Sequence, residues 1–184
     1  MRVTPTVISD VLRIELSSHD DVRGRFLRMF DVAAYAEHGI VGPFEQENVS
    51  TSGPDVLRGL HFQRGQPQGK LLTVVAGAIM DVAVDLRPES GTMGRWVGLE
   101  LTAERPAQVW VPPGFAHGFC VLRAPAVVVY RTTTAHDPED QWGIRWDDPD
   151  LAIQWPIRAP VLSPRDQALP TLMDLRSRGF FAER

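Results

Sequence analysis

The sequence contains a single cysteine, Cys120, among 184 residues. A chain with one cysteine cannot form an internal disulfide, which excludes the disulfide-stapled scaffolds and fits a reducing compartment. A nucleophilic role for a lone thiol would require a nearby base. A small, buried core residue is therefore the better interpretation of Cys120.

Long apolar stretches are also lacking. The first residues, MRVTPTVISDVLRIEL, contain neither an extended apolar segment nor a small-residue cleavage site, and no run elsewhere is long enough to cross a bilayer. We therefore predict a cytoplasmic protein with no membrane partner.

Net positive charge is absent as well, since the formal charge is -4 at pH 7. The overall field of the protein therefore does not attract nucleic acid, and we predict no nucleic-acid partner. An anionic ligand would have to be met by a local cluster of arginine and lysine side chains.

Repeats, low-complexity tracts and interdomain linkers are missing too, and the length suits one domain over residues 1–184. The 15 glycines and 15 prolines are spread along the chain between short runs rich in valine, leucine and aromatic residues, a pattern typical of many short strands. We predict an all-β fold, a double-sheet jelly roll (cupin-like β-roll) with a few short peripheral helices, whose interior can hold a small ligand. The predicted strands are residues 11–16, 25–30, 44–50, 71–75, 78–86, 96–101, 107–111, 118–122 and 126–133.

Three segments favour helix, and one favours a turn. Residues 31–38 are opened by an aspartate cap at Asp31 and closed at Gly39. Residues 147–154 suit a short helical turn, and residues 168–177 suit a C-terminal helix with MDL on its apolar face. The polar segment 19–24, HDDVRG, is predicted as a turn.

Residues 56–75, VLRGLHFQRGQPQGKLLTVV, place three basic side chains on two apolar runs. The polar segment between the runs is punctuated by glycine and proline, which is the pattern of a β-hairpin. His61 suits a general base, Lys70 an anchor for an anion or enolate, and Arg58 a fork for phosphate or carboxylate. Each also has a structural interpretation, either as a buried histidine bonded to a carbonyl or as a basic side chain whose head reaches water.

Several short sequence motifs occur in order along the chain: DVRGRF, LRGLHFQ, QGKLL, DVAVDLRPES, VPPGFAHGF and LSPRD. Together they run from about residue 7 to residue 172, and they resemble the dTDP-4-dehydrorhamnose 3,5-epimerase family of nucleotide-sugar enzymes. The resemblance implies the same cupin-type fold and an isomerase that needs no cofactor.

The reaction implied by this resemblance is epimerisation of a dTDP-4-keto-6-deoxy sugar at C3 and/or C5, in dTDP-rhamnose or other deoxysugar biosynthesis. His61 would remove a proton next to the ketone, and Asp166 in LSPRD would orient its imidazole. Lys70 would stabilise the enolate charge on the C4 oxygen. Tyr130 in VVVYRTT would return a proton to the opposite face, which suits its ordinary pKa near 10.

The resemblance also assigns residues to the nucleotide end of the dTDP-sugar. Arg23, Arg58 and Arg165 align with side chains that meet the diphosphate or lie near it, which suits the guanidinium fork. Gln46 and Asn48 correspond to the polar pair that the family uses along the nucleoside. Phe26 corresponds to the aromatic residue near the base.

A rival hypothesis is a cupin metal centre. Pro112, Gly114 and His117 in VPPGFAH have the spacing of the second cupin metal motif. The first motif would need two histidines one residue apart followed by a glutamate, whereas His61 is followed by a phenylalanine and a glutamine. Because the ligand count fails, we predict no metal and assign His117 to substrate binding or hydrogen bonding.

Three residues depart from the family pattern. Arg28 and Gln141 stand where glutamates are common, and His136 stands where a tyrosine is usual. The contacts to the base and the placement of the sugar are therefore expected to differ, and inversion at C3, at C5 or at both stays open.

Two other classes of protein also stay open. One is a 3,4-ketoisomerase, which shares the fold and the histidine base. The other is a non-catalytic sugar-nucleotide-binding cupin module, which the complete set of groups around His61 disfavours. The resemblance further suggests a homodimer that exchanges N-terminal segments and so covers exposed sheet edges.

Overall fold

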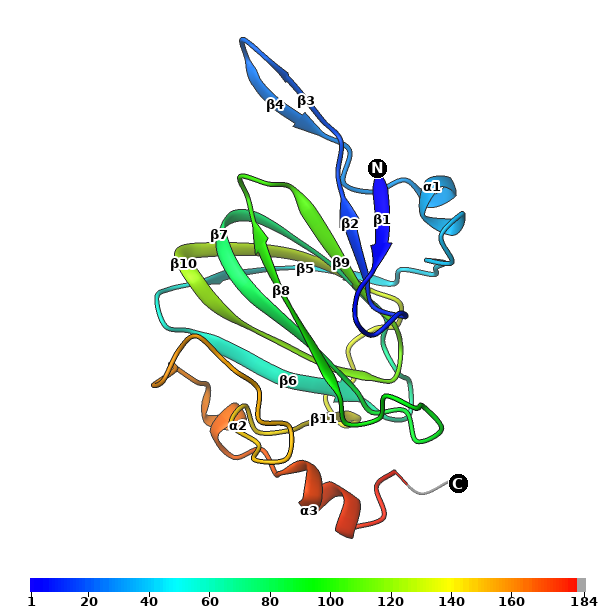
Figure 1. The fold of residues 1–184 in the computed structure, drawn as a ribbon, viewed down its shortest axis with the longest axis vertical. Helices are drawn as coiled ribbons and strands as arrows, with labels where there is room; N and C mark the ends of the chain where they lie inside the picture. Colours follow the sequence, from blue (N-terminus) through cyan, green and yellow to red (C-terminus); the bar gives the residue numbers. More distant parts are fainter. Residues whose placement is uncertain (182–184) are drawn as a thin grey trace.

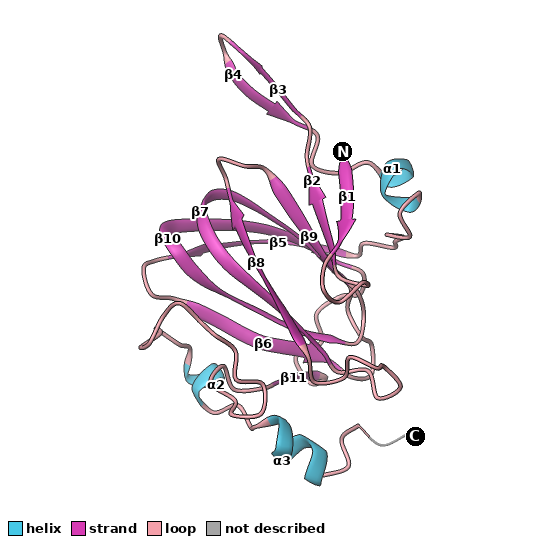
Figure 2. Ribbon diagram, viewed as in Figure 1, coloured by secondary structure: helices cyan, strands magenta, loops and turns pink. Residues whose placement is uncertain are grey.

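Strands dominate the computed structural model, which describes residues 1–181 (Figures 1 and 2). The helices are short and lie at the periphery of a β-roll, which confirms the predicted cupin-like jelly roll. The strands are β1 (Arg2–Pro5), β2 (Leu12–Glu15), β3 (Ser18–Asp21), β4 (Gly24–Leu27), β5 (Gln46–Ser52), β6 (Leu57–Gln63), β7 (Lys70–Asp85), β8 (Trp96–Thr102), β9 (Ala107–Val111), β10 (Phe115–Thr132) and β11 (Gln141–Gly143).

The two longest strands, β7 and β10, pair with each other and form the centre of the roll. The first part of β7 pairs with β9 and its second part with β8, while β10 pairs first with β6 and then with β5. β7 and β10 therefore stay paired with each other, while the strand on the other side of each one changes near its middle. This change of partner allows the sheet to fold over on itself.

The predicted pairs of strands at 71–75 with 78–86 and at 118–122 with 126–133 are each one continuous strand. In β7 the chain bends at Gly77, whose φ is +74°. A Cβ at this position would lie 2.3 Å from the carbonyl oxygen of Arg123, so only glycine fits. Turn residues in these segments bend the strands without ending them.

The predicted hairpin over residues 56–75 is wrong. β6 and β7 do not pair; both pair with β10, which lies between them. The connecting loop is held by other contacts, since the Gln63 side chain donates to the backbone oxygens of Gln66 and Ala135. A local turn pattern cannot reveal a strand that enters from 50 or so residues further along the chain. One consequence is that His61 lies opposite His117 in the register.

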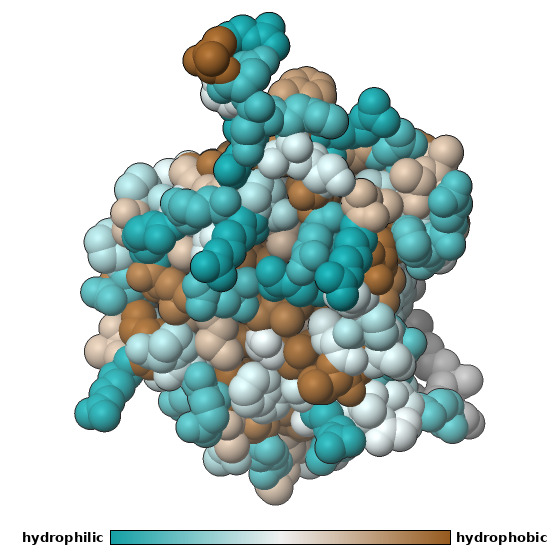
Figure 3. Space-filling model, turned by 45° about the horizontal axis from the view of Figure 1, so that its top comes forward, coloured by the Kyte–Doolittle hydropathy of each residue, from teal (hydrophilic) through white to brown (hydrophobic). Residues whose placement is uncertain are grey.

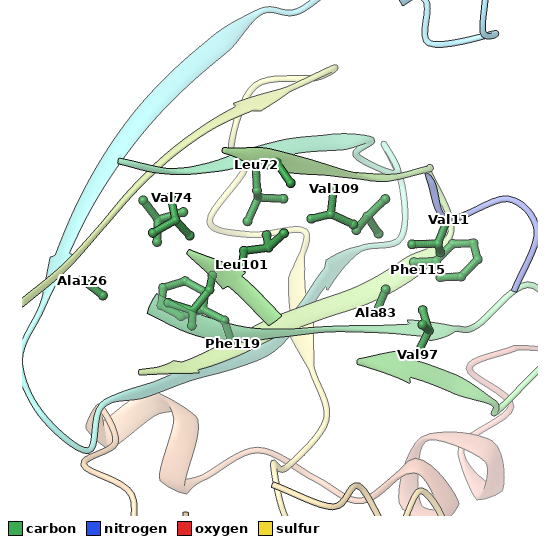
Figure 4. Close-up of a cluster of buried hydrophobic side chains, with 14 of the residues drawn as sticks. Val11, Leu72, Val74, Ala83, Val97, Leu101, Val109, Phe115, Phe119 and Ala126 are labelled. Atoms are coloured by element: carbon green, nitrogen blue, oxygen red, sulfur yellow. The ribbon is translucent and has the colours of Figure 1, made fainter. Parts of the chain in front are cut away.

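Apolar side chains from β7, β8, β9 and β10 converge in the largest core cluster (Figure 4). Leu72, Leu101 and Val109 are at most 1% exposed there. Cys120 is fully buried as well, and its burial raises the pKa of the thiol to about 11, which keeps it protonated. This confirms the interpretation of Cys120 as a packing residue.

The three helices differ in how well they were predicted. α1 (Val32–Ala36) begins after the Asp31 cap as expected, because the Asp31 carboxylate accepts the Ala34 N–H. Residues 147–154, predicted as a short helical turn, form no helix, but turn residues lie at 149–151 and the Ala152 N–H donates to the backbone oxygen of Asp148, which is the bond of one helical turn. The buried Asp148 carboxylate also accepts N–H groups from Leu151 and Leu172.

The predicted C-terminal helix is shorter than residues 168–177. Within the predicted segment only α3 (Leu172–Ser177) is helical, and a separate short helix, α2 (Pro164–Gln167), precedes that segment. α3 buries Leu172 and Leu175, whereas Met173, the first residue of the MDL segment predicted on its apolar face, is 62% exposed. Proline at position 170 cannot continue a helix from residue 168.

The segment predicted as a turn at 19–24 forms most of a two-stranded hairpin, β3 with β4, which projects from the body of the roll (Figure 1). Only residues 22–23 make the turn. The hairpin exposes apolar surface at its tip (Figure 3), where Val22 is fully exposed, and Phe26 is 66% exposed. A short polar sequence with two aspartates carries little strand propensity, which is why pairing was not predicted.

Among residues 1–181, no helix combines the length and the hydropathy needed to span a membrane.

Candidate active site

A cavity of about 560 Å³ opens between β5, β6, β7 and β10 and is closed at one side by α2. It brings together polar side chains from segments far apart in the sequence. Nine of the eleven predicted site residues line it: Gln46, Asn48, Arg58, His61, Lys70, His117, Tyr130, Arg165 and Asp166.

His61 and Asp166 form a hydrogen-bonded pair in this cavity. Nε2 of His61 lies 2.6 Å from Oδ1 of Asp166, and the two side chains are 25% and 5% exposed. Asp166 is held in place because it lies in α2, whose first turn is capped by the Ser163 hydroxyl. The other carboxylate oxygen accepts the N–H of Gly59.

The pKa of Asp166 is lowered from its ordinary value, which keeps the carboxylate ionised. Burial acts in the opposite direction, but the hydrogen bonds from His61, Gly59 and Ser163 together outweigh it. An ionised carboxylate at one imidazole nitrogen leaves the other nitrogen able to accept a proton. The pair is therefore suited to general-base chemistry.

Lys70 begins β7 and is buried within the same cavity. Its ammonium group donates to the backbone oxygen of His61 at 3.2 Å. Burial lowers the pKa of Lys70 to about 8, and the charge of Asp81 acts against that shift. At neutral pH this side chain is a fixed positive charge close to the His61–Asp166 pair.

Tyr130 lies on β10, opposite Asn48 of β5 on one side and Leu72 of β7 on the other. Burial raises the pKa of its hydroxyl, and the positive charge of Arg58 partly opposes that shift. The phenol is therefore protonated at neutral pH and can donate a proton into the cavity.

A second histidine–carboxylate pair, which sequence reasoning missed, lies beside the first. Nε2 of His117 is 2.7 Å from Oδ2 of Asp81, and the side chains are 9% and 1% exposed. The prediction that His117 is a hydrogen-bonding residue is consistent with this contact. The sequence did carry a signal that could have revealed Asp81: a charged residue stands inside the apolar run of β7, and a buried carboxylate requires a partner.

Two arginines at the cavity are held by uncharged oxygen atoms. Arg58 donates to the Ser52 hydroxyl at 3.0 Å, and Arg165 donates to the side-chain and backbone oxygens of Gln141 at 2.5 and 2.9 Å. Because these acceptors carry no charge, both guanidinium groups keep their positive charge available to an anion.

Further polar side chains line the cavity. The Gln46 side chain donates to Asn48 at 2.7 Å and accepts the backbone N–H of His136 at 2.8 Å. His136 and Gln141, two of the three residues that depart from the family pattern, both line the cavity. The third, Arg28, does not line it and pairs with Asp31.

Arg23 and Phe26 are the two predicted binding residues that do not line the cavity of their own chain. Both lie on the β3–β4 hairpin, where Arg23 bonds to Asp21 and its side chain is 86% exposed. Sequence order alone could not show that this hairpin projects away from the roll.

Within residues 1–181, no three histidine, cysteine, aspartate or glutamate side chains gather in a way that could hold a metal ion. His61 and His117 face each other in the register, but each is bonded to its own aspartate.

The fold and the cavity together define a class of protein: a cupin-like jelly roll whose interior combines a hydrogen-bonded histidine–aspartate pair, a tyrosine, a buried lysine and two arginines that no carboxylate neutralises. Comparison with known proteins narrows the class. The model of the dTDP-4-dehydrorhamnose 3,5-epimerase family matches residues 5–174, and the chain belongs to this family of isomerases.

Individual relatives agree with this assignment. The dTDP-4-dehydrorhamnose 3,5-epimerase of Escherichia coli (strain K12) is 47% identical over 179 residues, covering 95% of this chain and 96% of the relative. The crystal structure of the dTDP-6-deoxy-D-glucose-3,5-epimerase of Legionella pneumophila Philadelphia 1, in complex with dTDP-4-keto-L-rhamnose, superposes with a TM-score of 0.92 at 44% identity, covering 96% of this chain and 95% of that one.

A 3'-monoepimerase is also similar. The structure of the enzyme from Streptomyces bikiniensis, in complex with dTDP-quinovose, has a TM-score of 0.90 at 34% identity and covers 96% of this chain and 90% of that one.

Proposed function

We propose that this enzyme inverts C3 and C5 of a dTDP-4-keto-6-deoxy sugar, without a redox cofactor, through an enolate formed next to the ketone. One observation carries the proposal: the His61–Asp166 pair, the Lys70 ammonium and the Tyr130 hydroxyl line a single cavity. The 3,5-epimerases to which the chain is similar support the choice of substrate.

Each step follows from one group in the cavity. The free imidazole nitrogen of His61 takes a proton from a carbon next to the C4 ketone, and Asp166 stabilises the imidazolium that forms. The electron pair of the broken C–H bond moves onto the C4 oxygen, where the charge of Lys70 stabilises the enolate. Tyr130 then donates its proton to the opposite face of the same carbon, which inverts that centre.

The rim suits the nucleotide end of the substrate. Arg58 and Arg165 donate their hydrogen bonds to uncharged oxygen atoms, so no carboxylate neutralises their positive charges. Both guanidinium groups therefore fit the two phosphates. Gln46 and Asn48, which are bonded to each other, fit the polar edge of the nucleoside. The volume of about 560 Å³ lies in the range of small-molecule sites.

Inversion at a single carbon is the second candidate. It is favoured by the similarity to a 3'-monoepimerase and by the presence of His136 and Gln141 at the cavity. Because these side chains lie at the rim, they act on how the sugar is placed and leave the base and acid unchanged.

Proton NMR of the protein with dTDP-4-keto-6-deoxyglucose in deuterated water tests the proposal. We expect deuterium incorporation and inversion at both C3 and C5, read from the sugar ring couplings. Inversion at one carbon only would establish the mono-epimerase instead. A sugar whose C–H bonds do not exchange would contradict epimerase chemistry on this substrate and would favour a binding module.

Replacing Tyr130 by phenylalanine removes only the hydroxyl. We expect inversion to slow by about 100-fold or more, since the proton donor for the second face is lost. Deuterium exchange should persist, because His61 can return a deuteron to the face from which it took the proton. Both are measured in the same NMR experiment.

Tyr35 offers a matched control for that substitution, because it is the only other tyrosine of the chain and does not line the cavity. Its hydroxyl donates to the backbone oxygen of Met29. Tyr35→Phe should leave the ratio of inversion to exchange unchanged. An equal loss of exchange and inversion in Tyr130→Phe would show that Tyr130 is not a separate acid.

We further propose that the enzyme is a homodimer in which the β3–β4 hairpin packs against a second copy. The hairpin projects from the roll and carries the exposed apolar side chains Val22 and Phe26 (Figures 1 and 3). Exposed apolar surface of this kind is stabilised by burial against a partner. Packing between copies would bring Arg23 and Phe26 to the cavity of the other protomer.

The double substitution Val22→Ser with Phe26→Ser tests the dimer. We expect the mass measured by light scattering to fall from twice 20.5 kDa toward 20.5 kDa at low micromolar concentration. Val7→Ser, which alters another exposed valine outside the hairpin, should keep the dimer mass. A wild-type chain that runs as a monomer would overturn this proposal.

A further inference from the structure

Arg165 is held at the cavity by a single residue, Gln141. The guanidinium group donates from Nη1 to Oε1 of Gln141 at 2.5 Å and from Nη2 to the backbone oxygen of the same residue at 2.9 Å. Because the guanidinium group is planar, it cannot turn without breaking one of these two bonds. Gln141 therefore fixes the orientation of an arginine that is otherwise exposed on α2.

These bonds occupy only part of the N–H donors of the guanidinium group, and both acceptors are uncharged. The remaining donors and the full positive charge stay available on the side of the cavity, which both residues line. An anion that enters the cavity is therefore met by an arginine whose orientation is already set, so little side-chain freedom is lost on binding.

A closed ring of contacts connects this arginine to His61. Gln141 lies on β11, which pairs with β6 so that Gly143 is opposite His61. Arg165 is followed in α2 by Asp166, whose carboxylate oxygen lies 2.6 Å from Nε2 of His61. The arginine and the histidine are thus joined twice, once through α2 and once through Gln141 and β11.

The strand that carries Gln141 is held by its backbone and its neighbours. A Cβ at Gly143 would lie 2.6 Å from the backbone oxygen of Leu60, so β11 is packed closely on β6. The next side chain, Trp142, packs edge-on against Phe180, with ring centroids 4.6 Å apart. Replacing the Gln141 side chain should therefore leave the strand in place and release only Arg165.

We propose that Gln141 is a positioning residue that clamps Arg165 at a fixed place relative to His61. Through Arg165 it sets how tightly the diphosphate is held and which ring carbon of the sugar faces the base. The inference rests on the proposed function, in which Arg165 binds a phosphate and His61 removes the proton. Gln141 does not touch the reacting atoms in this scheme, and its effect arises because an anchored substrate presents its carbons in a defined orientation.

Binding of inorganic pyrophosphate and of dTDP, measured by calorimetry, tests the clamp without any reaction. Gln141→Met keeps the length of the side chain, adds no charge and removes the acceptor at 2.5 Å. We expect the affinity for both ligands to fall by about fivefold. Gln141→Ala covers the case in which methionine does not fit, and it should lose at least as much.

Gln167→Met is the matched control, because it makes the same change on the helix that carries Arg165. Gln167 bonds to the backbone oxygen of Leu162 at 3.4 Å and does not line the cavity. Its replacement should leave both affinities unchanged. An equal loss in Gln141→Met and Gln167→Met would overturn the proposal.

A double-mutant cycle separates positioning from a purely structural role. If Gln141 acts through Arg165, then Gln141→Met should change the affinity by less than about 1.5-fold when it is introduced into Arg165→Ala. The exposed Arg165 can be truncated without opening the core. A fivefold loss in both backgrounds would show that Gln141 acts independently of Arg165 and would contradict the clamp.

The second readout is the ratio of deuterium exchange rates at C3 and C5 of dTDP-4-keto-6-deoxyglucose. In Gln141→Met we expect this ratio to shift by about threefold or more, whereas Gln167→Met should keep the wild-type ratio. An unchanged ratio would overturn the role of Gln141 in placing the sugar. If the wild type binds pyrophosphate but exchanges neither proton, the proposed reaction fails, and the cycle still decides the clamp.

Discussion

Replacing His61 by asparagine is expected to lower kcat for both deuterium exchange and inversion by about 10²–10⁴-fold. Asparagine retains a polar side chain of similar reach toward Asp166, but it cannot accept a proton at neutral pH. The loss should fall on exchange as well as inversion, because in the proposed mechanism His61 breaks the first C–H bond. This distinguishes it from Tyr130→Phe, which should lose inversion alone.

The measurement is the rate of deuterium uptake at C3 and C5 under saturating dTDP-4-keto-6-deoxyglucose, with dTDP affinity determined separately by calorimetry. Affinity should change little, because the proposed mechanism assigns the nucleotide end to Arg58 and Arg165 at the rim. His38→Asn is a suitable control, since this exposed histidine does not line the cavity. Retention of most exchange activity by His61→Asn would show that the base is another group.

Replacing Lys70 by methionine should lower kcat by about 10²–10³-fold with a much smaller effect on KM. Methionine fills a similar volume without charge, so the cavity keeps its shape while the enolate loses its stabilising cation. The charge on the sugar's C4 oxygen develops only as the C–H bond breaks. An interaction that strengthens at that point affects the rate more than substrate binding.

The pH dependence of the same group provides a check on this prediction. Burial holds the pKa of Lys70 near 8, so wild-type kcat should fall as the pH rises through that value and the ammonium group loses its proton. Lys70→Arg retains a charge that does not titrate in this range, and the activity it keeps should show no decline near pH 8. A similar alkaline decline in Lys70→Arg would assign that decline to a different group.

Much of the fold could be predicted because local patterns agree with the final structure. Runs of valine, leucine and aromatic residues became strands, and residues 107–111 match β9 throughout. Asp31 caps α1 as its side chain suggests, since a cap depends only on neighbouring N–H groups. The family could be assigned for a related reason. Its sequence motifs are short and contiguous, so they can be recognised from the order of residues without knowledge of the fold.

Sequence reasoning failed where a property depends on segments far apart. The pattern of residues 56–75 favours a hairpin, but β10 separates β6 from β7, because burial of both faces of the roll decides which strands pair. Strand β4 overlaps the predicted strand 25–30, but its partner β3 was missed for a comparable reason, since the pairing of this polar hairpin does not rest on an apolar pattern.

The sequence by itself determined which histidine, tyrosine, lysine and carboxylate are available for the proposed site, and which family the chain belongs to. Only the tertiary structure decided how they are joined. His61 meets Asp166 across 105 positions of the chain, and His117 meets Asp81 across 36. The physical reason is that a hydrogen bond or a charge interaction depends on distance in space and on burial, and both are set by the pairing of long strands around one core.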